Sequence, residues 1–592
     1  MKTDQTDLAA QYPDLPSIPS DIEISQNAVM KPIAEISPIL GIDPDDLELY
    51  GKYKAKIENK VWEDIKDRPD GKLIVVTAVT PTPAGEGKTC TSIGLAQAFG
   101  KLGVKSALAI REPSLGPTFG IKGGAAGGGY SQVLPMEDIN IHFTGDLHAI
   151  SIAHNLLSSV LDNSMHHDNP LNIDPERVTW RRTIDLCDRQ LRNCEVGLGS
   201  KFDGFPHNSG FDIVPASEVM TIMALALDME DLRERLGRIV VAYNTSGKPV
   251  FARELSCIGS MCVILKDAIK PNLVQTCEHT PVLIHCGPFG NIAHGCNSVR
   301  ATRLALKLAP YVITEAGFAA DLGAEKFVNI KCRQAGLTPN GAVLVATVRA
   351  LKYHGGVEKE DLKTENVEAL QTGCENLRTH AENLQKYGLP VVVAINRFPT
   401  DTPAELDAVR QFCSDMGVEC SLSEVVARGG DGGLDLAQKI KNIVDTKPGA
   451  PNFFYQIEDP IKSKIEAIAL EVYRADGVDF TEEAEASIAS LEENGLANWP
   501  ICMAKTQSSI SDDPKKRNAP RGWRLQVRDV KVSNGAGFIV ALTGKMMLMP
   551  GMPRESAVQK IDIDSNGRIQ DLPCFKILFF LQKFVADIRL LK

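Results

Sequence analysis

Residues 82–89 have the residue types of a phosphate-binding loop. They end in the Gly-Lys-Thr of a P-loop, although Thr82 stands where the usual motif has its first glycine. Gly85 and Gly87 permit a tight backbone whose amides point at phosphate oxygens. Lys88 would reach the β- and γ-phosphates, and the hydroxyl of Thr89 would ligate Mg²⁺. The alternative is a glycine-rich turn with a solvated lysine. We predict that ATP or GTP binds here, on Thr82, Pro83, Ala84, Gly85, Glu86, Gly87, Lys88 and Thr89.

Arg111 and Glu112 form a second candidate site, at the end of a strand expected over residues 104–110. Ligand-binding groups lie at this end of the strands in open α/β sheets. The planar guanidinium of Arg111 suits bidentate capture of a carboxylate or an acyl phosphate. Glu112 would hold Mg²⁺ or orient an amine. The alternative is an ordinary Arg–Glu pair on a surface loop.

A glycine-rich stretch follows, with seven glycines between Gly116 and Gly129. So many glycines disfavour a helix or a packed strand, because each loses much conformational entropy on folding. A flexible linker would contain more serine and would lack the embedded Phe119, Ile121 and Lys122. The stretch therefore predicts a loop that approaches a ligand closely or moves over it.

The elements around these residues alternate between strands and helices. Residues 72–80 are a β-branched run, residues 89–100 have a helical pattern, and residues 104–110 are again strand-like, which together make a βαβ unit. Further strands are expected at 238–242, 282–285, 311–314, 342–347 and 389–395, with helices at 364–386 and 403–416. This alternation predicts an α/β protein with a largely parallel sheet.

The composition is that of an ordinary globular enzyme. The chain has 592 residues, of which 43% are hydrophobic and 23% are charged, and its net charge is −11. Nucleic-acid-binding and membrane-surface proteins usually carry a basic face, so neither partner is expected. Residues 1–30 lack the regions of a secretory signal, and no apolar run reaches the roughly 18 residues of a membrane span. We expect a cytoplasmic protein.

The 14 cysteines include no CxxC pair. His285 with Cys286 and His294 with Cys296 come nearest to metal-ligand spacing, but they lack the paired ligands of a recognised site. We interpret them as buried thiols and structural histidines in a reducing compartment.

Several blocks resemble the formate–tetrahydrofolate ligase family, in order from about residue 30 to about residue 570. Beside the P-loop and the glycine-rich stretch, they are residues 111–117, 130–133, 143–150, 179–182, 287–295, 314–318, 396–402, 500–507 and 535–538. The resemblance implies a ligase that joins formate to N10 of tetrahydrofolate with MgATP. Two alternatives are a P-loop ATPase switch or scaffold, which gives no reason for Arg111, and a ligase of the same fold for another carboxylate.

The resemblance also implies roles for particular residues. Arg111 would hold formate in line with the γ-phosphate, and formyl phosphate would form, with Lys88 and Arg111 stabilising its oxygens. N10 would then attack the formyl carbon while Asp146 or Glu112 accepts a proton. Asp146 could equally be a helix cap or a buried hydrogen-bond partner.

The pterin would need a stacking surface. Phe398 matches a family position in that pocket, with Asn396 and Asp401 beside it, although a phenylalanine after a strand is often ordinary core. Phe289 is expected to contact the nucleotide. Val426 stands where some members carry a stacking tryptophan, so affinity for folate or adenine would be weaker unless another aromatic residue compensates.

We predict four parts. Residues 1–385 form a P-loop NTPase-like nucleotide- and formate-binding α/β domain, 386–455 a second α/β domain contributing to the folate pocket, 456–570 a smaller α+β domain and 571–592 an atypical tail without an assigned function. The tail contains the apolar residues 577–581 and is either a packed helix or the product of an altered reading frame. The family is typically homotetrameric and often activated by a monovalent cation, and the physiological direction of the reaction stays open.

Overall fold

The computed structural model describes residues 12–83, 85–120, 126–200, 202–204, 206–544 and 546–572. Ala84 of the P-loop, Ile121 and Lys122 of the glycine-rich stretch, and the predicted tail from residue 573 lie outside these residues.

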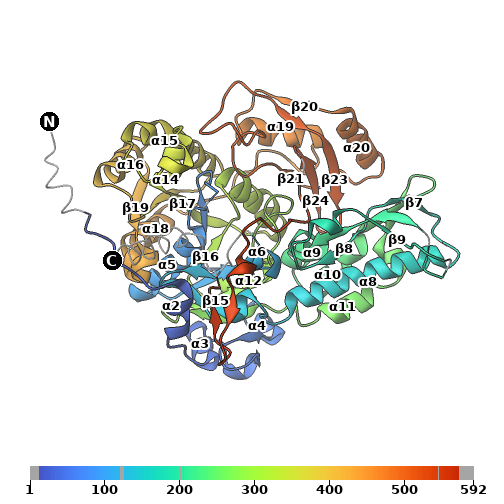
Figure 1. The fold of residues 1–592 in the computed structure, drawn as a ribbon, viewed down its shortest axis with the longest axis horizontal. Helices are drawn as coiled ribbons and strands as arrows, with labels where there is room; N and C mark the ends of the chain where they lie inside the picture. Colours follow the sequence, from blue (N-terminus) through green and yellow to red (C-terminus); the bar gives the residue numbers. More distant parts are fainter. Residues whose placement is uncertain are drawn as a thin grey trace.

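A 12-stranded sheet forms the centre of the molecule (Figure 1). Its main path runs through β1 (Leu47–Leu49), β2 (Ala55–Ile57), β14 (Asn272–Thr276), β15 (Pro281–Ile284), β4 (Ser106–Ile110), β16 (Tyr311–Glu315), β3 (Lys72–Ala78), β17 (Pro339–Ala346), β18 (Val391–Asn396) and β19 (Glu419–Ser423). All pairings from β15 to β19 are parallel. The prediction of an α/β protein with a mostly parallel sheet is confirmed.

The remaining pairings of this sheet are antiparallel. β14 pairs with β15, β2 and β6 (Ser131–Leu134), and β6 also pairs with β5 (Gly127–Gly128). The end of the glycine-rich stretch is therefore part of the sheet rather than a free loop.

Helices cover both faces of the sheet. Successive side chains of each strand point to opposite faces, so both faces carry apolar side chains that the helices bury. Ile74 and Val76 of β3 pack in one cluster with α5 (Lys88–Lys101) and α18 (Leu434–Thr446). Leu73 and Val75 pack in another cluster, whose helices include α12 (Val299–Leu308), α14 (Val348–His354), α15 (Val367–Lys386) and α16 (Pro403–Asp415). The predicted strand–loop–helix–strand unit is thus confirmed as β3, α5 and β4.

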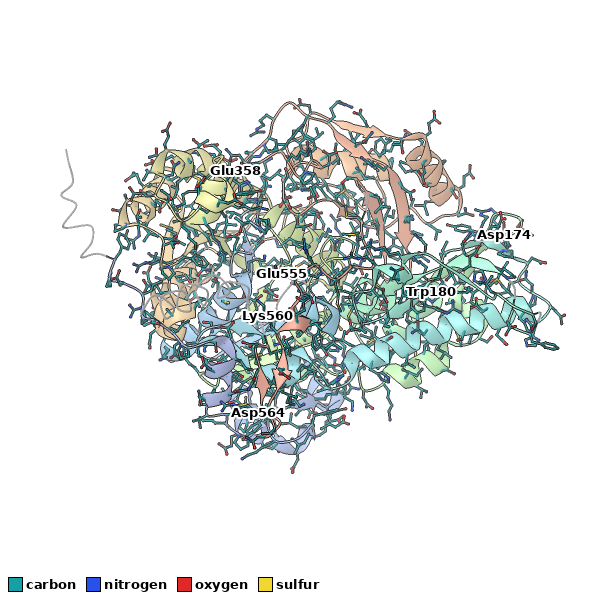
Figure 2. The ribbon with its side chains drawn as sticks, viewed as in Figure 1. Asp174, Trp180, Glu358, Glu555, Lys560 and Asp564 are labelled. Carbon is teal, nitrogen blue, oxygen red and sulfur yellow. The ribbon has the colours of Figure 1, made fainter. Side chains whose placement is uncertain are left out.

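A third hydrophobic cluster is centred in a lobe built mainly from residues 146–269, and it also includes apolar residues at 286–299, 330 and 502–540 (Figure 1). Its elements include α8 (Asp146–His166), α9 (Glu218–Leu225), α10 (Met229–Arg238), α11 (Ile258–Leu265), β7 (Ile173–Val178), β12 (Val240–Asn244) and β13 (Pro249–Phe251). Trp180, labelled in Figure 2, stacks on His154 of α8 with ring centroids 4.1 Å apart. The strand expected at 238–242 is β12, but it belongs to a separate antiparallel sheet with β7 and β13, so its place in the parallel sheet was wrongly predicted. The alternation of strands and helices along the chain does not reveal which sheet a given strand joins.

The C-terminal region has its own small sheets and helices. They are α19 (Ile461–Glu471), β20 (Val478–Phe480), α20 (Glu482–Glu493), β21 (Ile501–Ala504), β22 (Leu525–Val527), β23 (Asp529–Ser533), β24 (Phe538–Leu542) and the hairpin of β25 (Asp562–Ile563) and β26 (Ile569–Gln570). Glu358, labelled in Figure 2, pairs with Arg517 at 3.0 Å and ties this region to the segment after α14. The predicted boundary at residues 385/386 falls inside the central sheet, because β18 and β19 continue it. The division into domains stays a prediction.

Candidate active site

The loop at residues 82–89 lies between the carboxyl end of β3 and the start of α5. Gly85 and Gly87 have φ values of 78° and 77°, a region that favours glycine. A Cβ on Gly87 would overlap the amide of Asn396, so this position also needs glycine for space. The sequence therefore gives the strand, tight loop and helix start that a phosphate site requires.

Glu86 explains why threonine stands at position 82. The main-chain N–H and the hydroxyl of Thr82 both donate to Oε1 of Glu86, at 2.6 and 2.8 Å. Thr347 donates to the other oxygen, Oε2. Glu86 is only 2% exposed, and a buried carboxylate needs such donors. Thr82 thus holds the loop closed through its side chain, which glycine could not do.

Lys88 is the first residue of α5 and is partly buried. Burial lowers the pKa of Lys88 to about 8, with Arg111 lowering it further and Glu315 opposing the shift. The ammonium therefore lies among charges of both signs, beside the candidate carboxylate site.

Thr89, Glu315 and Arg111 meet at the ends of neighbouring strands. The hydroxyl of Thr89 donates to Oε2 of Glu315 at 2.8 Å, and Nη2 of Arg111 lies 3.6 Å from Oε1. Among the described residues, neither Nε of Arg111 nor Oε1 of Glu315 has a hydrogen-bond partner, although both atoms are buried. Such buried atoms usually have partners, so their place beside the loop at residues 82–89 makes them candidates for contact with a ligand.

Glu112 and Asp146 have different environments. Burial, followed by the charge of Asp146, raises the pKa of Glu112 well above its usual value, and Oε2 of Glu112 has no hydrogen-bond partner in the described part of the chain. Asp146 instead accepts from Lys56 at 2.7 Å and from Asn272 at 2.8 Å, one partner for each carboxylate oxygen. The carboxylate of Asp146 is thus engaged, whereas Glu112 keeps a free oxygen.

Asn396 and Phe398 reach the same loop from the end of β18. The amide of Asn396 donates to the main-chain oxygen of Glu86 at 3.0 Å. Phe398 is half-buried, with the guanidinium carbon of Arg349 4.1 Å from its ring centroid. The main-chain N–H of Phe398 donates to Asp401 at 2.8 Å, and burial raises the pKa of Asp401 to about 7. These contacts bring Asn396 and Phe398, the residues predicted for folate, next to the loop at residues 82–89.

Phe289 packs against a different set of residues from those around Phe398. Its ring packs on a small cluster of Cys187, Ile213 and Met549, and its main-chain N–H donates to the carbonyl of Pro215. A Cβ on Gly116 would press against Ile213, so this cluster borders the start of the glycine-rich stretch. Contact of Phe289 with the nucleotide stays a prediction.

The described end of the glycine-rich stretch is held from two sides. The N–H of Gly129 donates to Asp21, at the start of α2 (Asp21–Asn27), at 2.7 Å. The N–H of Tyr130 donates at 2.9 Å to the carbonyl of Val426 in α17 (Val425–Arg428). A Cβ on Gly129 would overlap that carbonyl, which explains the glycine. Val426 therefore positions this stretch through its backbone.

The two histidines that were interpreted as structural, His285 and His294, differ in the hydrogen bonding of their rings. His285 is hydrogen-bonded at both ring nitrogens, to Ser298 at 2.7 Å and to the carbonyl of Ala268 at 2.6 Å. His294 is fully buried, and within the described residues neither of its ring nitrogens has a hydrogen-bond partner. Burial, then Lys331, Lys326 and Arg111, lowers the pKa of His294 well below its usual value.

Oxygen ligands for Mg²⁺ are available at the loop. Mg²⁺ is usually bound by one or two carboxylates together with substrate phosphates rather than by a cage of protein ligands. In the described part of the chain, no group of three or more His, Cys, Asp or Glu residues could hold a metal ion by itself. The pair of Thr89 and Glu315 fits the mode in which phosphates complete the shell.

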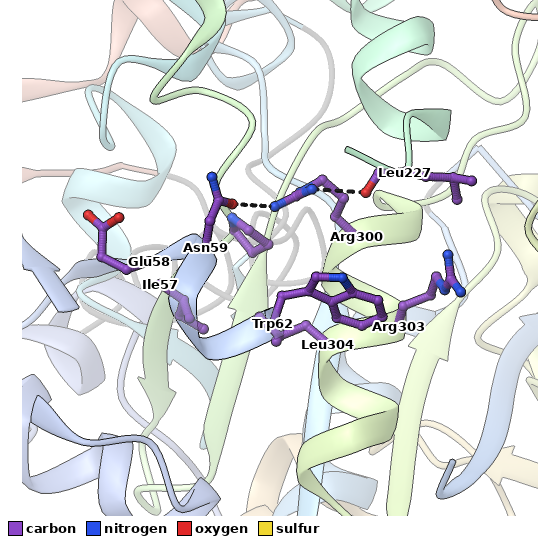
Figure 3. A pocket seen from close by; sticks show the side chains of 9 residues that line it. Ile57, Glu58, Asn59, Trp62, Leu227, Arg300, Arg303 and Leu304 are labelled. Carbon is purple, nitrogen blue, oxygen red and sulfur yellow. Dashed lines mark hydrogen bonds between the residues drawn. The ribbon is translucent and has the colours of Figure 1, made fainter. Parts of the chain in front are cut away.

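A separate hollow lies between α4 (Asn59–Ile65) and α12 (Figure 3). Arg300 donates there to Asn59 at 2.6 Å and to the carbonyl of Leu227 at 2.9 Å, while Arg303 lies over the ring of Trp62. The space, about 20 Å³, suits roughly one water molecule, and none of the predicted site residues line it.

Three further residues, Glu315, Arg349 and Lys56, were not predicted from the sequence as site residues. Glu315 follows the strand expected at 311–314, which is the same signal that singled out Arg111. Arg349 comes shortly after the strand expected at 342–347. Lys56 had no comparable signal, because its role depends on a distant partner, Asp146.

The fold and the site together define an α/β enzyme that gathers charged side chains beside a glycine-rich loop, at the carboxyl ends of parallel strands. Residues 19–573 match the family model of formate–tetrahydrofolate ligase, so the chain belongs to that family. The predicted membership is confirmed, and the chain is an ATP-dependent carbon–nitrogen ligase (EC 6.3.4.3) of one-carbon metabolism that acts on formate and tetrahydrofolate. Across the described residues, no helix is long and apolar enough to cross a membrane.

Proposed function

We propose that formate is activated at the junction of Thr89, Glu315 and Arg111. The loop at residues 82–89, preceded by β3 and followed by α5, would hold the phosphates of ATP as in P-loop NTPases. Arg111 would bind the formate carboxylate in line with the γ-phosphate, through donors that Glu315 orients. The observation that carries this assignment is the meeting of these three side chains at adjacent strand ends.

Mg²⁺ would be held by Thr89, Glu315 and the phosphates, and it would supply positive charge to the transferring phosphoryl group. Glu112, the metal ligand predicted from the sequence, is the alternative carboxylate for this role. We prefer Glu315 because it already contacts Thr89.

The first step would form formyl phosphate. A formate oxygen attacks the γ-phosphorus, the bond to the β-phosphate oxygen breaks, and ADP leaves. Lys88 at the start of α5 and Arg111 at the end of β4 would stabilise the oxygens that carry the negative charge.

The second step would transfer the formyl group to N10 of tetrahydrofolate. N10 attacks the formyl carbon, the carbon–oxygen bond to phosphate breaks, and the amine loses a proton. We assign Glu112 as the proton acceptor, because one of its carboxyl oxygens has no hydrogen-bond partner among the described residues. Asp146, whose oxygens are engaged by Lys56 and Asn272, would act only by positioning.

The pterin would stack on Phe398, whose ring carries Arg349 over one face. Asn396, hydrogen-bonded to Glu86, would keep the pterin site next to the nucleotide loop. Phe289 at the nucleotide, weakened stacking at Val426, a homotetramer, a cytoplasmic location and activation by a monovalent cation stay predictions.

The test is product formation by the purified full-length chain with MgATP, formate and tetrahydrofolate. The ligase should give a product that absorbs as methenyl-tetrahydrofolate after acidification, and the signal should require all three substrates. ATP hydrolysis without a formate-dependent product would instead favour a nucleotide-driven switch.

A further inference from the structure

Arg349 joins two parts of the proposed site that are far apart in the sequence. It is the second residue of α14, directly after β17. Its Nη2 donates to the carbonyl of Gly85, and its Nε lies 3.5 Å from Oε2 of Glu86. The guanidinium carbon is 4.1 Å from the centroid of the Phe398 ring. One guanidinium therefore contacts the loop at residues 82–89 and also lies over an aromatic ring.

These contacts belong to a buried network. The side chain of Arg349 is 17% exposed and that of Glu86 is fully buried. Thr347, two residues before Arg349, donates to the same Oε2 of Glu86. Asn396, two residues before Phe398, donates to the main-chain oxygen of Glu86 at 3.0 Å. The loop and the ring are thus connected by two routes, through Arg349 and through Asn396.

A phosphate that enters the loop is bound by its amides, so the peptide units of the loop become fixed in one orientation. The carbonyl of Gly85 belongs to this backbone and accepts from Arg349. An ordered carbonyl therefore orders the guanidinium, and the guanidinium in turn holds the ring of Phe398. Lysine could not reproduce this arrangement, because its ammonium is a point charge without a planar face.

We propose that Arg349 is a positioning residue that couples nucleotide binding on the loop to the stacking of tetrahydrofolate on Phe398. The inference rests on the proposed function, in which the pterin contacts this ring. Arg349 occupies one face of the ring and the pterin uses the other. Because coupling between two ligands is reciprocal, tetrahydrofolate tightens nucleotide binding by the same factor.

The experiment measures tetrahydrofolate binding to the full-length protein, with and without a saturating non-hydrolysable ATP analogue and Mg²⁺, in the absence of formate. In the wild type, the analogue should tighten binding roughly fivefold or more. In Arg349→Lys, this factor should fall to within about twofold of unity, while each ligand alone still binds. Arg349→Gln should give the same loss, because a neutral amide cannot maintain both contacts.

Arg378→Lys is the matched control. Arg378 lies on α15, 4.8 Å from the ring centroid of Phe412, and pairs with Glu375 at 3.1 Å. Like Arg349, Arg378 lies over a phenylalanine ring, but its partners among the described residues are Phe412 and Glu375 rather than the loop at residues 82–89. Replacing Arg378 should therefore leave the coupling between nucleotide and tetrahydrofolate unchanged.

Full coupling in Arg349→Lys and Arg349→Gln would overturn the proposal, as would a wild type without coupling. Phe398→Leu separates this inference from the proposed function. If Phe398→Leu bound tetrahydrofolate like the wild type, the folate assignment would fail and the inference with it. If Phe398→Leu bound weakly while both Arg349 variants kept their coupling, only the role of Arg349 would fail.

Discussion

The hydroxyl of Thr89 donates a 2.8 Å hydrogen bond to Oε2 of Glu315, although the two residues are 226 positions apart in the chain. The contact exists because β16, which ends at Glu315, lies between β3 and β4. It places a carboxylate between the nucleotide loop and Arg111.

Glu315→Gln should raise the Mg²⁺ concentration needed for half-maximal activity by about tenfold or more, since losing even a hydrogen-bond partner of a metal ligand typically weakens metal binding by about 10- to 100-fold. Thr89 could still donate to the amide oxygen, so the fold should be kept. The measurement is activity against Mg²⁺ at saturating ATP. Glu358→Gln, at a side chain that is 65% exposed, is the control. An unchanged Mg²⁺ requirement would argue for Glu112 as the metal ligand.

Thr82→Gly restores the usual first glycine of the P-loop motif, yet it should lower the stability of the folded protein. The change removes the hydroxyl donor to the buried Glu86, and hydrogen bonds to charged groups contribute about 1.5–3 kcal/mol. We expect the free energy of unfolding to fall by about 2 kcal/mol in urea denaturation. Thr82→Ser, which keeps the hydroxyl, should lose much less. Equal stability of the glycine variant and the wild type would refute the role of Thr82.

Nucleotide affinity should fall as the pH rises through about 8, where Lys88 loses its proton in the free protein. Since this pKa is lowered on folding, the unfolded chain binds more protons above pH 8, and this group's contribution to stability should rise between pH 8 and 10.5. Affinity and stability should thus change in opposite directions, which titration calorimetry and urea denaturation can measure. In Lys88→Arg, which stays charged, the alkaline loss of affinity should disappear. A loss that persisted there would have to come from another group.

Lys56 and Asp146 form a buried ion pair at 2.7 Å, with both side chains at most 3% exposed. Lys56→Met leaves the carboxylate without its cation and should lower the free energy of unfolding by about 3–5 kcal/mol. The double variant Lys56→Met/Asp146→Asn should recover part of this loss, because no unpaired charge remains. Strictly additive losses in the double-mutant cycle would show that the two side chains do not act as a pair.

The local secondary structure around the candidate site could be predicted from the sequence. The β-branched run of β3, the glycine loop and α5 are contiguous, and Arg111 and Asn396 each follow a recognisable strand. Glu315 and Arg349 could not be placed, because their roles depend on strand order. β16 and β17 flank β3 although both come more than 200 residues later, and periodicity does not encode that neighbourhood.

In the proposed mechanism, Arg111 captures formate beside the loop at residues 82–89. Its most direct test is Arg111→Ala, with product formation measured against formate concentration and ATP binding measured separately. Arg303→Ala, at a guanidinium over Trp62 in the separate hollow, is the control. We predict that Arg111→Ala loses formate saturation while its ATP affinity stays within about fivefold of the wild type, since a contact of a partly exposed charge contributes about 1 kcal/mol or less. A wild-type KM for formate in Arg111→Ala would contradict this role of Arg111.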